Sequence, residues 1–249
     1  MIYQAHRGVR TEYPENTMPA FEAAVRQGYG VIELDVSVTK DGRFVLLHDA
    51  TINRMARLQD GSELEETVNI SDITYEQALD YDFGIRLSQE FKGTKIALFE
   101  DVLCLAKKNN IKLKIDNKYQ KFTSGQRKAF FELLKPYEDI VSLTCFDTDE
   151  LKKVTGIFPS MHFHYDGPVN DAVLEEIGTL LPKEQLTVWL PIECPKTSWV
   201  KVAFADEKLS ETVKKYAKLG LWIISNAGEL AMAEKLGADI IETNGEVKP

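Results

Sequence analysis

Residues 31–49 read VIELDVSVTKDGRFVLLHD, two runs of β-branched and apolar residues separated by KDG. An Asp-Gly pair between such runs is a strong local signal for a β-hairpin. With Asp41 and Gly42 as the two central turn residues, Asp35 lies opposite His48, with Cβ atoms roughly 4.5–5.5 Å apart. Glu33 precedes Asp35 by two residues, so both carboxylates point to the same face of the strand. The hairpin therefore predicts a histidine held beside two carboxylates.

Polar residues also end two other strand-like runs. His6 and Arg7 follow the N-terminal run IYQA, and Asp116 and Lys118 stand two residues apart in the run KLKIDNK. We expect Asp116 and Lys118 to share one face of a strand, as the first carboxylate pair does. Two carboxylates on one face have three interpretations: they bind a hard cation, they act as an acid/base pair, or they simply lie on a solvated strand face. The apolar surroundings of the first pair and the recurrence of the pattern argue against a merely solvated face.

The order of the elements predicts a TIM (β/α)8 barrel, and 249 residues is the usual size of one such barrel. Strands are expected at residues 2–5, 31–39, 112–118, 139–145, 160–164, 186–190, 219–225 and 239–243. Helices are expected at residues 17–28, 100–109, 125–136, 149–155, 171–180, 207–218 and 228–236. Residues 51–95 lack a strong strand signal and contain one short helical piece at 75–79, which predicts a small insertion after the second strand. We expect a single domain over residues 1–249, with the active residues at the carboxyl ends of the strands.

The composition restricts the class of partner. Hydrophobic residues make up 44% of the chain and charged residues 28%, which is typical of a soluble globular protein. The net charge of −9 argues against nucleic acid or an anionic membrane as partner, because both would repel the chain. No apolar run approaches the length of a membrane span. An anionic substrate therefore needs a local positive site.

The cysteines and the N-terminus predict a cytoplasmic protein. Cys104, Cys145 and Cys194 are odd in number and far apart, which favours buried thiols in a reducing compartment over a disulfide framework. The N-terminus begins directly with a strand-like run and shows no basic, apolar and small-residue progression of a secretion signal. The sequence carries no signal for oligomeric state.

Five motifs occur in order: AHRG at 5–8, PENT at 14–17, the E-x-D strand at 33–35, TKDG at 39–42 and HD at 48–49. Each is weak alone, but together and at this spacing they resemble the glycerophosphodiester phosphodiesterase family. The resemblance continues more thinly to the end of the chain. It implies a barrel with a small insertion after strand two, and the hydrolysis of small-molecule glycerophosphodiesters to glycerol 3-phosphate and an alcohol.

The resemblance also implies roles for single residues. Three carboxylates would bind one divalent cation, Mg²⁺ or Ca²⁺: Glu33, Asp35 and Asp116. The two histidines, His6 and His48, would act as general base and general acid, in an order that the sequence does not reveal. Arg7 and Lys118 would assist catalysis by holding the phosphate. Glu15, Phe146 and Trp222 would contribute to substrate binding. The third metal ligand is usually Glu in the family, so Asp116 is a departure.

Several assignments stay open at this stage. Glu15 and Asn16 either cap the first helix or contact phosphate or a metal-bound water. For Arg54, a structural salt bridge is the favoured interpretation. Phe146 and Trp222 either line the pocket or face the core. For Trp199 and the apolar residues among 200–204, the favoured interpretation is a helix or loop that packs on the barrel. His162 and His164 alternate on one strand without a nearby carboxylate, which favours one satisfied core histidine and one exposed histidine over a ligand pair.

Other functions compete with glycerophosphodiester hydrolysis. One is a phospholipase D-like or C-like barrel that acts on lipid, although such relatives outside cells tend to show disulfides, a secretion signal or an exposed apolar face. Another is a catalytically silent protein that binds a glycerophosphodiester, which only the substituted Asp116 favours. A metal-dependent lyase barrel is a third, but it leaves Arg7 beside His6 without a role.

Overall fold

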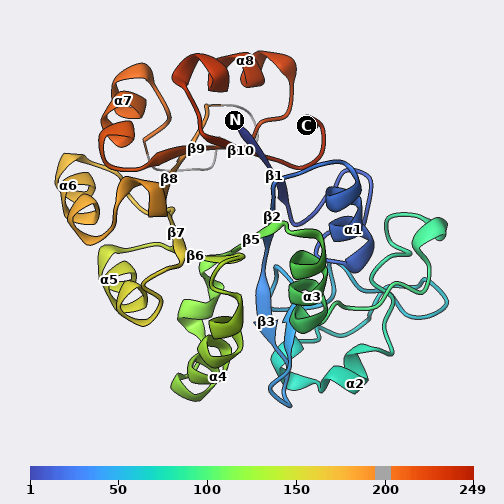
Figure 1. The fold of residues 1–249 in the computed structure, drawn as a ribbon. Coiled ribbons are helices and arrows are strands. Elements are labelled where there is room, and N and C mark those ends of the chain that lie inside the picture. Colours follow the sequence, from blue (N-terminus) through green and yellow to red (C-terminus); the bar gives the residue numbers. More distant parts are fainter. Residues whose placement is uncertain (194–202) are drawn as a thin grey trace.

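The computed structural model describes residues 1–193 and 203–249, and its described strands close into a parallel barrel (Figure 1). The order around the barrel is β1-β10-β9-β8-β7-β6-β5-β2, with β2 hydrogen-bonded to β1. Its strands are β1 (Ile2–His6), β2 (Val31–Leu34), β5 (Lys112–Ile115), β6 (Val141–Cys145), β7 (His162–Tyr165), β8 (Leu186–Pro191), β9 (Lys218–Trp222) and β10 (Ile240–Thr243). The predicted TIM barrel is confirmed.

A ring of helices surrounds the barrel in Figure 1. Its members are α1 (Met18–Arg26), α3 (Phe99–Asn109), α4 (Ser124–Leu134), α5 (Thr148–Ile157), α6 (Asp171–Leu180), α7 (Glu207–Tyr216) and α8 (Ala227–Leu236). Helices α5 to α8 each have an Asp or Asn as N-cap, whose side chain accepts a hydrogen bond from the backbone N–H three residues further on. These N-caps are Asp147, Asn170, Asp206 and Asn226. Helix α5 continues through Gly156 to Ile157, beyond the predicted end at residue 155.

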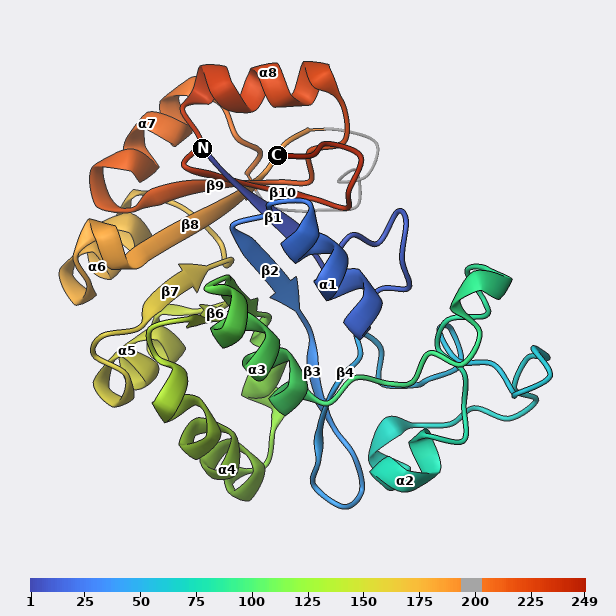
Figure 2. The same cartoon turned by 45° about the vertical axis from the view of Figure 1, so that its right-hand side comes forward.

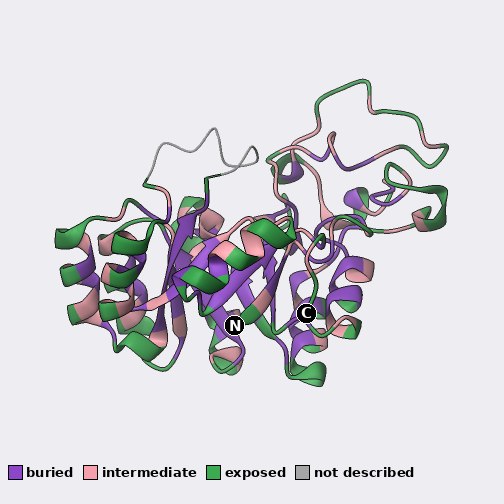
Figure 3. Ribbon diagram, turned by 90° about the horizontal axis from the view of Figure 1, so that it is seen from above, coloured by how far each residue is buried: buried purple, intermediate pink, exposed green. Residues whose placement is uncertain are grey.

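The main hydrophobic core fills the layer between barrel and helices, where Figure 3 shows the strands almost entirely buried. Phe21, Phe99, Phe130 and Phe158 are fully buried there. Inside the barrel, Trp189 on β8 is 1% exposed and packs against Gly220 on β9, where an added Cβ would lie 2.6 Å from the indole ring. The large indole therefore requires glycine on the neighbouring strand.

The insertion has a smaller core of its own. It begins with an antiparallel pair, β3 (Val36–Val38) and β4 (Phe44–Leu46), and contains the short helix α2 (Tyr75–Ala78). Figure 2 shows it to one side of α1 and α3, and Figure 3 shows it projecting beyond the end of the barrel opposite the N-terminus. Its buried side chains include Val45, Leu47, Ile52, Phe83 and Ile96. This separate cluster lies next to the carboxyl ends of the first strands.

The hairpin differs from its prediction by one residue. Val36 pairs with Leu46 and Val38 with Phe44, so the turn spans three residues and Asp35 faces Leu47, whose N–H donates to the Asp35 carbonyl at 2.9 Å. The predicted pairing of Asp35 with His48 is therefore wrong.

The physical reason lies in the turn itself. The Thr39 hydroxyl donates to the Asp41 carboxylate at 2.6 Å and accepts from the Arg43 N–H at 3.0 Å. Gly42 adopts a φ of 80°, as a three-residue turn with one left-handed residue requires. The expected single strand at 31–39 is also interrupted at Asp35, between β2 in the barrel and β3 in the hairpin.

The run KLKIDNK is shorter as a strand than expected. Strand β5 ends at Ile115, and Lys118 lies in a 3-10 helix over Asn117–Lys121. The prediction that Asp116 and Lys118 share a face of one strand is wrong, because the strand geometry ends before either residue.

The cysteine prediction holds only in part. Cys145 is a buried free thiol, whereas Cys104 on α3 is exposed, and Cys194 lies outside the described residues. The expectation of buried thiols is therefore wrong for Cys104. Among the helices of the described ranges, none combines the length and apolar character of a membrane span.

Candidate active site

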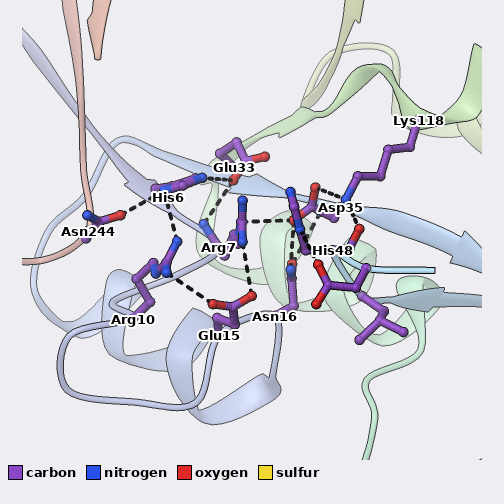
Figure 4. A network of polar contacts seen from close by, with 12 residues as sticks. His6, Arg7, Arg10, Glu15, Asn16, Glu33, Asp35, His48, Lys118 and Asn244 are labelled. Carbon is purple, nitrogen blue, oxygen red and sulfur yellow. Dashed lines mark hydrogen bonds and ion pairs between the residues drawn. The ribbon is translucent and has the colours of Figure 1, made fainter. Parts of the chain in front are cut away.

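A cavity of about 320 Å³ opens at the carboxyl ends of the barrel strands. It is lined by His6, Arg7, Glu33, Asp35, His48, Lys114, Asp116, Asp166, Trp222, Ile223 and Glu242. Most of the site residues expected from the sequence are in this set, and they lie on or directly after β1, β2, β5 and β9 or in the loop after β4. Figure 4 shows the network of polar contacts around its first residues.

Asp35 is the most heavily bonded carboxylate of the cavity. Its oxygens lie 2.7 Å from Lys118 Nζ and 3.2 Å from Arg7 Nε, and they accept from Asn16 Nδ2 at 2.9 Å. Burial opposes ionisation, but Lys118 and Arg7 outweigh it and hold the pKa of Asp35 at about 2. Asn16 also accepts from the Asp35 N–H at 3.2 Å, so it holds both ends of this residue. Asn16 therefore positions Asp35 instead of capping the first helix.

Glu33 and Asp116 are under-neutralised carboxyls beside Asp35. Burial and then the charge of Asp35 raise the pKa of Asp116, and the same two causes raise the pKa of Glu33 well above its ordinary value. Glu33 Oε2 accepts from the Arg7 N–H at 2.9 Å and lies 3.9 Å from His6 Nε2. The local electrostatics therefore favour an additional cation between these groups.

The donor types fit a hard divalent cation, since Glu33, Asp35 and Asp116 supply only carboxylate oxygens. As the side chains stand in the described ranges, no three His, Cys, Asp or Glu residues are grouped so as to hold a metal ion. Asp35 is engaged by Lys118 and Arg7. An ion shared by the three carboxylates thus requires Asp35 to turn from these partners.

His6 is held in one orientation at the end of β1. Its side chain is 13% exposed, and Nδ1 lies 2.8 Å from Asn244 Oδ1. With Nδ1 donating to this oxygen, Nε2, which faces Glu33, would have its lone pair available. Burial lowers the pKa of His6, which keeps the ring neutral. Asn244 was not foreseen as its partner.

His48 has a different environment. Its side chain is 38% exposed, and Nδ1 lies 2.7 Å from Asp49 Oδ1. The His48 carbonyl accepts from Lys118 Nζ. Asp49 also accepts from Arg54 Nε at 2.5 Å, so the carboxylate that orients His48 is itself fixed by an arginine. His48 reaches the same cavity as His6 through the loop after β4, despite the shifted hairpin.

Glu15 lies behind Arg7, outside the set of residues that line this cavity. It accepts from Arg7 Nη1 at 3.1 Å and from Arg54 Nη2 at 2.6 Å, and Arg10 Nη2 lies 3.3 Å away. Burial is outweighed by these arginines, which lower the pKa of Glu15 to about 2. Arg54 therefore forms the salt bridge that the sequence favoured, and it ties the insertion to the loop after β1. Glu15 makes none of the helix-cap contacts considered for it.

Three polar residues of the cavity were missed: Lys114 and Glu242, which are buried, and Asp166, which is partly buried. Lys114 Nζ lies 3.5 Å from Glu242 Oε2 and 4.3 Å from the centre of the Trp189 ring, and burial raises the pKa of Asp166 to about 6. Lys114 stands two residues before Asp116, and Glu242 is a charged residue in an apolar strand. Lys114 and Glu242 could have been found as charged residues within expected strands. Asp166 follows its expected strand, and no pattern in the sequence singles it out.

The remaining candidates are spread over the barrel. Trp222 lines the cavity, but Phe146 is 49% exposed and is not among the lining residues. His164 is buried, as expected of a core histidine. His162 is partly buried and bonds the Thr187 hydroxyl at 2.8 Å, so the expectation of an exposed histidine is wrong. Residues 199–202 lie outside the described part, and Phe204 is partly buried.

Comparison with known proteins gives consistent results. The chain is 34% identical over 158 residues to the uncharacterized protein YqiK of Bacillus subtilis, covering 62% of this chain and 62% of that protein. It is 35% identical over 128 residues to a glycerophosphodiester phosphodiesterase of Bacillus altitudinis, covering 50% of this chain and 49% of that protein. These matches thus span about half to three-fifths of the relatives' own lengths.

The fold is similar to that of a phosphodiesterase from Oleispira antarctica, solved in complex with the product sn-glycerol-3-phosphate. The TM-score is 0.77 at 19% identity, covering 99% of this chain and 94% of that one. At such low identity the likeness concerns the fold. The model of the glycerophosphoryl diester phosphodiesterase family matches residues 6–172, about two thirds of the sequence and the part that carries most of the cavity. The chain therefore belongs to the glycerophosphoryl diester phosphodiesterase family.

Proposed function

We propose that this protein hydrolyses glycerophosphodiesters to glycerol 3-phosphate and an alcohol, with the help of one divalent cation. The observation that carries the proposal is the cavity itself: two histidines, Arg7, Lys114 and five carboxyl residues line one space at the carboxyl ends of the strands, and Lys118 contacts one of these carboxyls, Asp35. The family membership and the glycerophosphodiester phosphodiesterase of Bacillus altitudinis support the same activity.

The cation would be held by Glu33, Asp35 and Asp116, and when bound it would stabilise negative charge on the phosphoryl oxygens. Mg²⁺ and Ca²⁺ both suit oxygen ligands. Arg7 and Lys118, released from Asp35, would donate to the same oxygens. Asp116 stands where the family usually has Glu, and its side chain is shorter by one methylene. Whether its carboxylate reaches the cation therefore depends on where β5 ends.

The environments of the two histidines suggest their roles. His6 is neutral and would have the Nε2 lone pair available, so it would accept a proton from the water that attacks phosphorus as the bond to the alcohol oxygen breaks. His48 is more exposed, and Asp49 holds its Nδ1, so it would donate a proton to the leaving alcohol. The alcohol would then depart on the solvent side.

The test is release of glycerol 3-phosphate from glycerophosphocholine and glycerophosphoglycerol, with Mg²⁺ or Ca²⁺ and with EDTA. We expect turnover that EDTA abolishes and that metal restores. His162→Gln is the matched control for His6→Ala, because it changes a histidine at the other end of the barrel. A chain that releases no glycerol 3-phosphate from either substrate with either metal would refute the proposed activity and favour a binding protein.

A further inference from the structure

A second cavity, of about 160 Å³, lies between the loop after β1 and the insertion. We call it the arginine cavity, because Arg10, Arg54 and Arg86 line it together with Glu15. Tyr13 and two apolar side chains of the insertion, Phe83 and Leu87, also line it. None of the residues in this wall belongs to the cavity described above.

The arginine cavity carries an excess of positive charge. Glu15 is its single acidic lining residue, and Arg7, Arg10 and Arg54 all contact it. Asp49 pairs with Arg54 from outside the cavity, and exposed Arg86 has no ion pair with any described residue. The three arginines of this wall, Arg10, Arg54 and Arg86, thus face two carboxylates, Glu15 and Asp49, which leaves one positive charge. A chain with a net charge of −9 places this excess of positive charge here.

The arginines influence one another. Burial, followed by the like charges of Arg7 and Arg54, lowers the pKa of Arg10, although Glu15 acts in the opposite direction. The side chain of Arg10 is 30% exposed, so a ligand can reach it. An anion in the arginine cavity would offset this repulsion and would bind the planar forks through paired hydrogen bonds.

The arginine cavity adjoins the catalytic cavity. Arg10 Nη1 lies 3.5 Å from His6 Nδ1, and Arg10 Nη2 lies 3.3 Å from Glu15. In Figure 4, Arg10 stands between His6 and Glu15, with Arg7 beside them. The two cavities thus lie on either side of one layer of side chains. On the His48 side, Asp49 bonds both His48 and Arg54, and Arg54 lines the arginine cavity, so an alcohol that leaves beside His48 would extend toward it.

We propose that the arginine cavity binds a phosphomonoester on the alcohol part of the substrate. The inference rests on the proposed hydrolysis and names its preferred substrate class: glycerophosphodiesters whose alcohol carries a further phosphate. The negative charge of a phosphomonoester is complementary to the excess positive charge of this wall, and its oxygens suit the guanidinium groups. A neutral alcohol gains nothing from this site, and a cationic alcohol is repelled by it.

The experiment compares glycerophosphoinositol 4-phosphate with glycerophosphoinositol, which differ by one phosphate, at fixed ionic strength. We expect the kcat/KM of the unaltered protein to favour the phosphorylated substrate by roughly tenfold, as one or two charge-assisted contacts allow. Arg86→Gln should bring the preference to within about twofold, while hydrolysis of glycerophosphoinositol stays unchanged. Arg86 is exposed, so this variant tests the site without disturbing the core.

The control is Arg43→Gln, which removes an arginine that pairs with Glu100 near the hairpin turn, outside both cavities. It should keep the full preference. If the unaltered protein hydrolyses both substrates with equal kcat/KM, the inference is overturned while the proposed function stands.

If neither substrate is hydrolysed, the proposed function fails, and calorimetric binding of glycerophosphoinositol 4-phosphate decides the inference separately. Tighter binding to the unaltered protein than to Arg86→Gln supports the site, and equal binding to the two overturns it.

Discussion

The two ends of the barrel each contain a pair of histidines, and their surroundings differ. At the carboxyl end, His6 and His48 stand among carboxylates, arginines and lysines. At the amino end, His164 bonds the Ser142 hydroxyl at 2.9 Å and accepts from Trp189 Nε1 at 2.9 Å. The side chains that hydrogen-bond the second pair are neutral, whereas carboxylates and basic side chains line the cavity of the first.

The difference separates function from packing. His162 and His164 lie 5.0 Å apart between ring centres, and burial lowers the pKa of His162 to about 4 and that of His164 well below its usual value. Burial also lowers the pKa of His6, yet its Nε2 lone pair faces the catalytic cavity. A histidine that can exchange a proton with a ligand thus differs from one whose ring nitrogens are already bonded inside the barrel.

The largest expected effect concerns the carboxyl-end pair. His6→Ala and His48→Ala should each lower kcat by about 10²–10⁴-fold, the usual contribution of a general base or acid. Thermal unfolding should change little, and steady-state kinetics with glycerophosphocholine measures the loss. An equal loss in His162→Gln would erase the contrast between the two ends.

A smaller effect on turnover is expected from Lys118. In Lys118→Ala, Asp35 loses its 2.7 Å partner and the phosphate loses a cation, so kcat/KM should fall by roughly 10²-fold. The matched control is Lys121→Ala, which removes an exposed lysine of the same 3-10 helix. Comparable losses in the two variants would show that the helix, and not the Lys118 charge, is responsible.

At the amino end the expected effect is on stability. His164→Ala removes two buried hydrogen bonds and leaves a cavity beside Trp189, which should cost about 2–4 kcal/mol of unfolding free energy. Activity per folded molecule should be kept, because the ring does not line the catalytic cavity. Urea unfolding followed by Trp fluorescence, with activity measured well below the midpoint, checks both. A stable but inactive variant contradicts this assignment.

The smallest effect is a pH dependence at the border between barrel and insertion. The folded-state pKa of Glu15, about 2, lies below the unfolded value near 4.5, so its stabilisation is complete above pH 4.5. It is lost as the pH falls from 4.5 toward 2, because the unfolded chain then binds a proton at Glu15 that the arginine-paired carboxylate of the folded state does not bind. Glu15→Gln should weaken the dependence of unfolding free energy on pH in this window. An unchanged acid profile in the variant would show that other carboxyls dominate.

The sequence predicted the barrel and most of the cavity because strand order fixes which residues meet. Parallel strands bring their carboxyl ends together, so His6, Glu33 and Asp116 could be grouped from their positions alone. The hairpin register could not be predicted, since it depends on how Thr39 bonds the turn. A difference of one residue in the turn then moved the expected partner of Asp35.

Partners from distant parts of the chain were also beyond reach. Asn244 meets His6 across 238 positions, and Lys114 meets Glu242 across the barrel interior. Nothing local in the sequence marks such a pair. The role of Asn16 is a similar case, because PENT looks like the start of a helix until Asp35 is placed beside it.

The most direct test of the catalytic cavity is a crystal soaked with Ca²⁺ and glycerol 3-phosphate. The account predicts one ion bound by Glu33, Asp35 and Asp116, with the phosphate contacted by Arg7 and Lys118 and with His6 and His48 on either side. An ion bound without Asp116, or a phosphate bound away from both histidines, would contradict it.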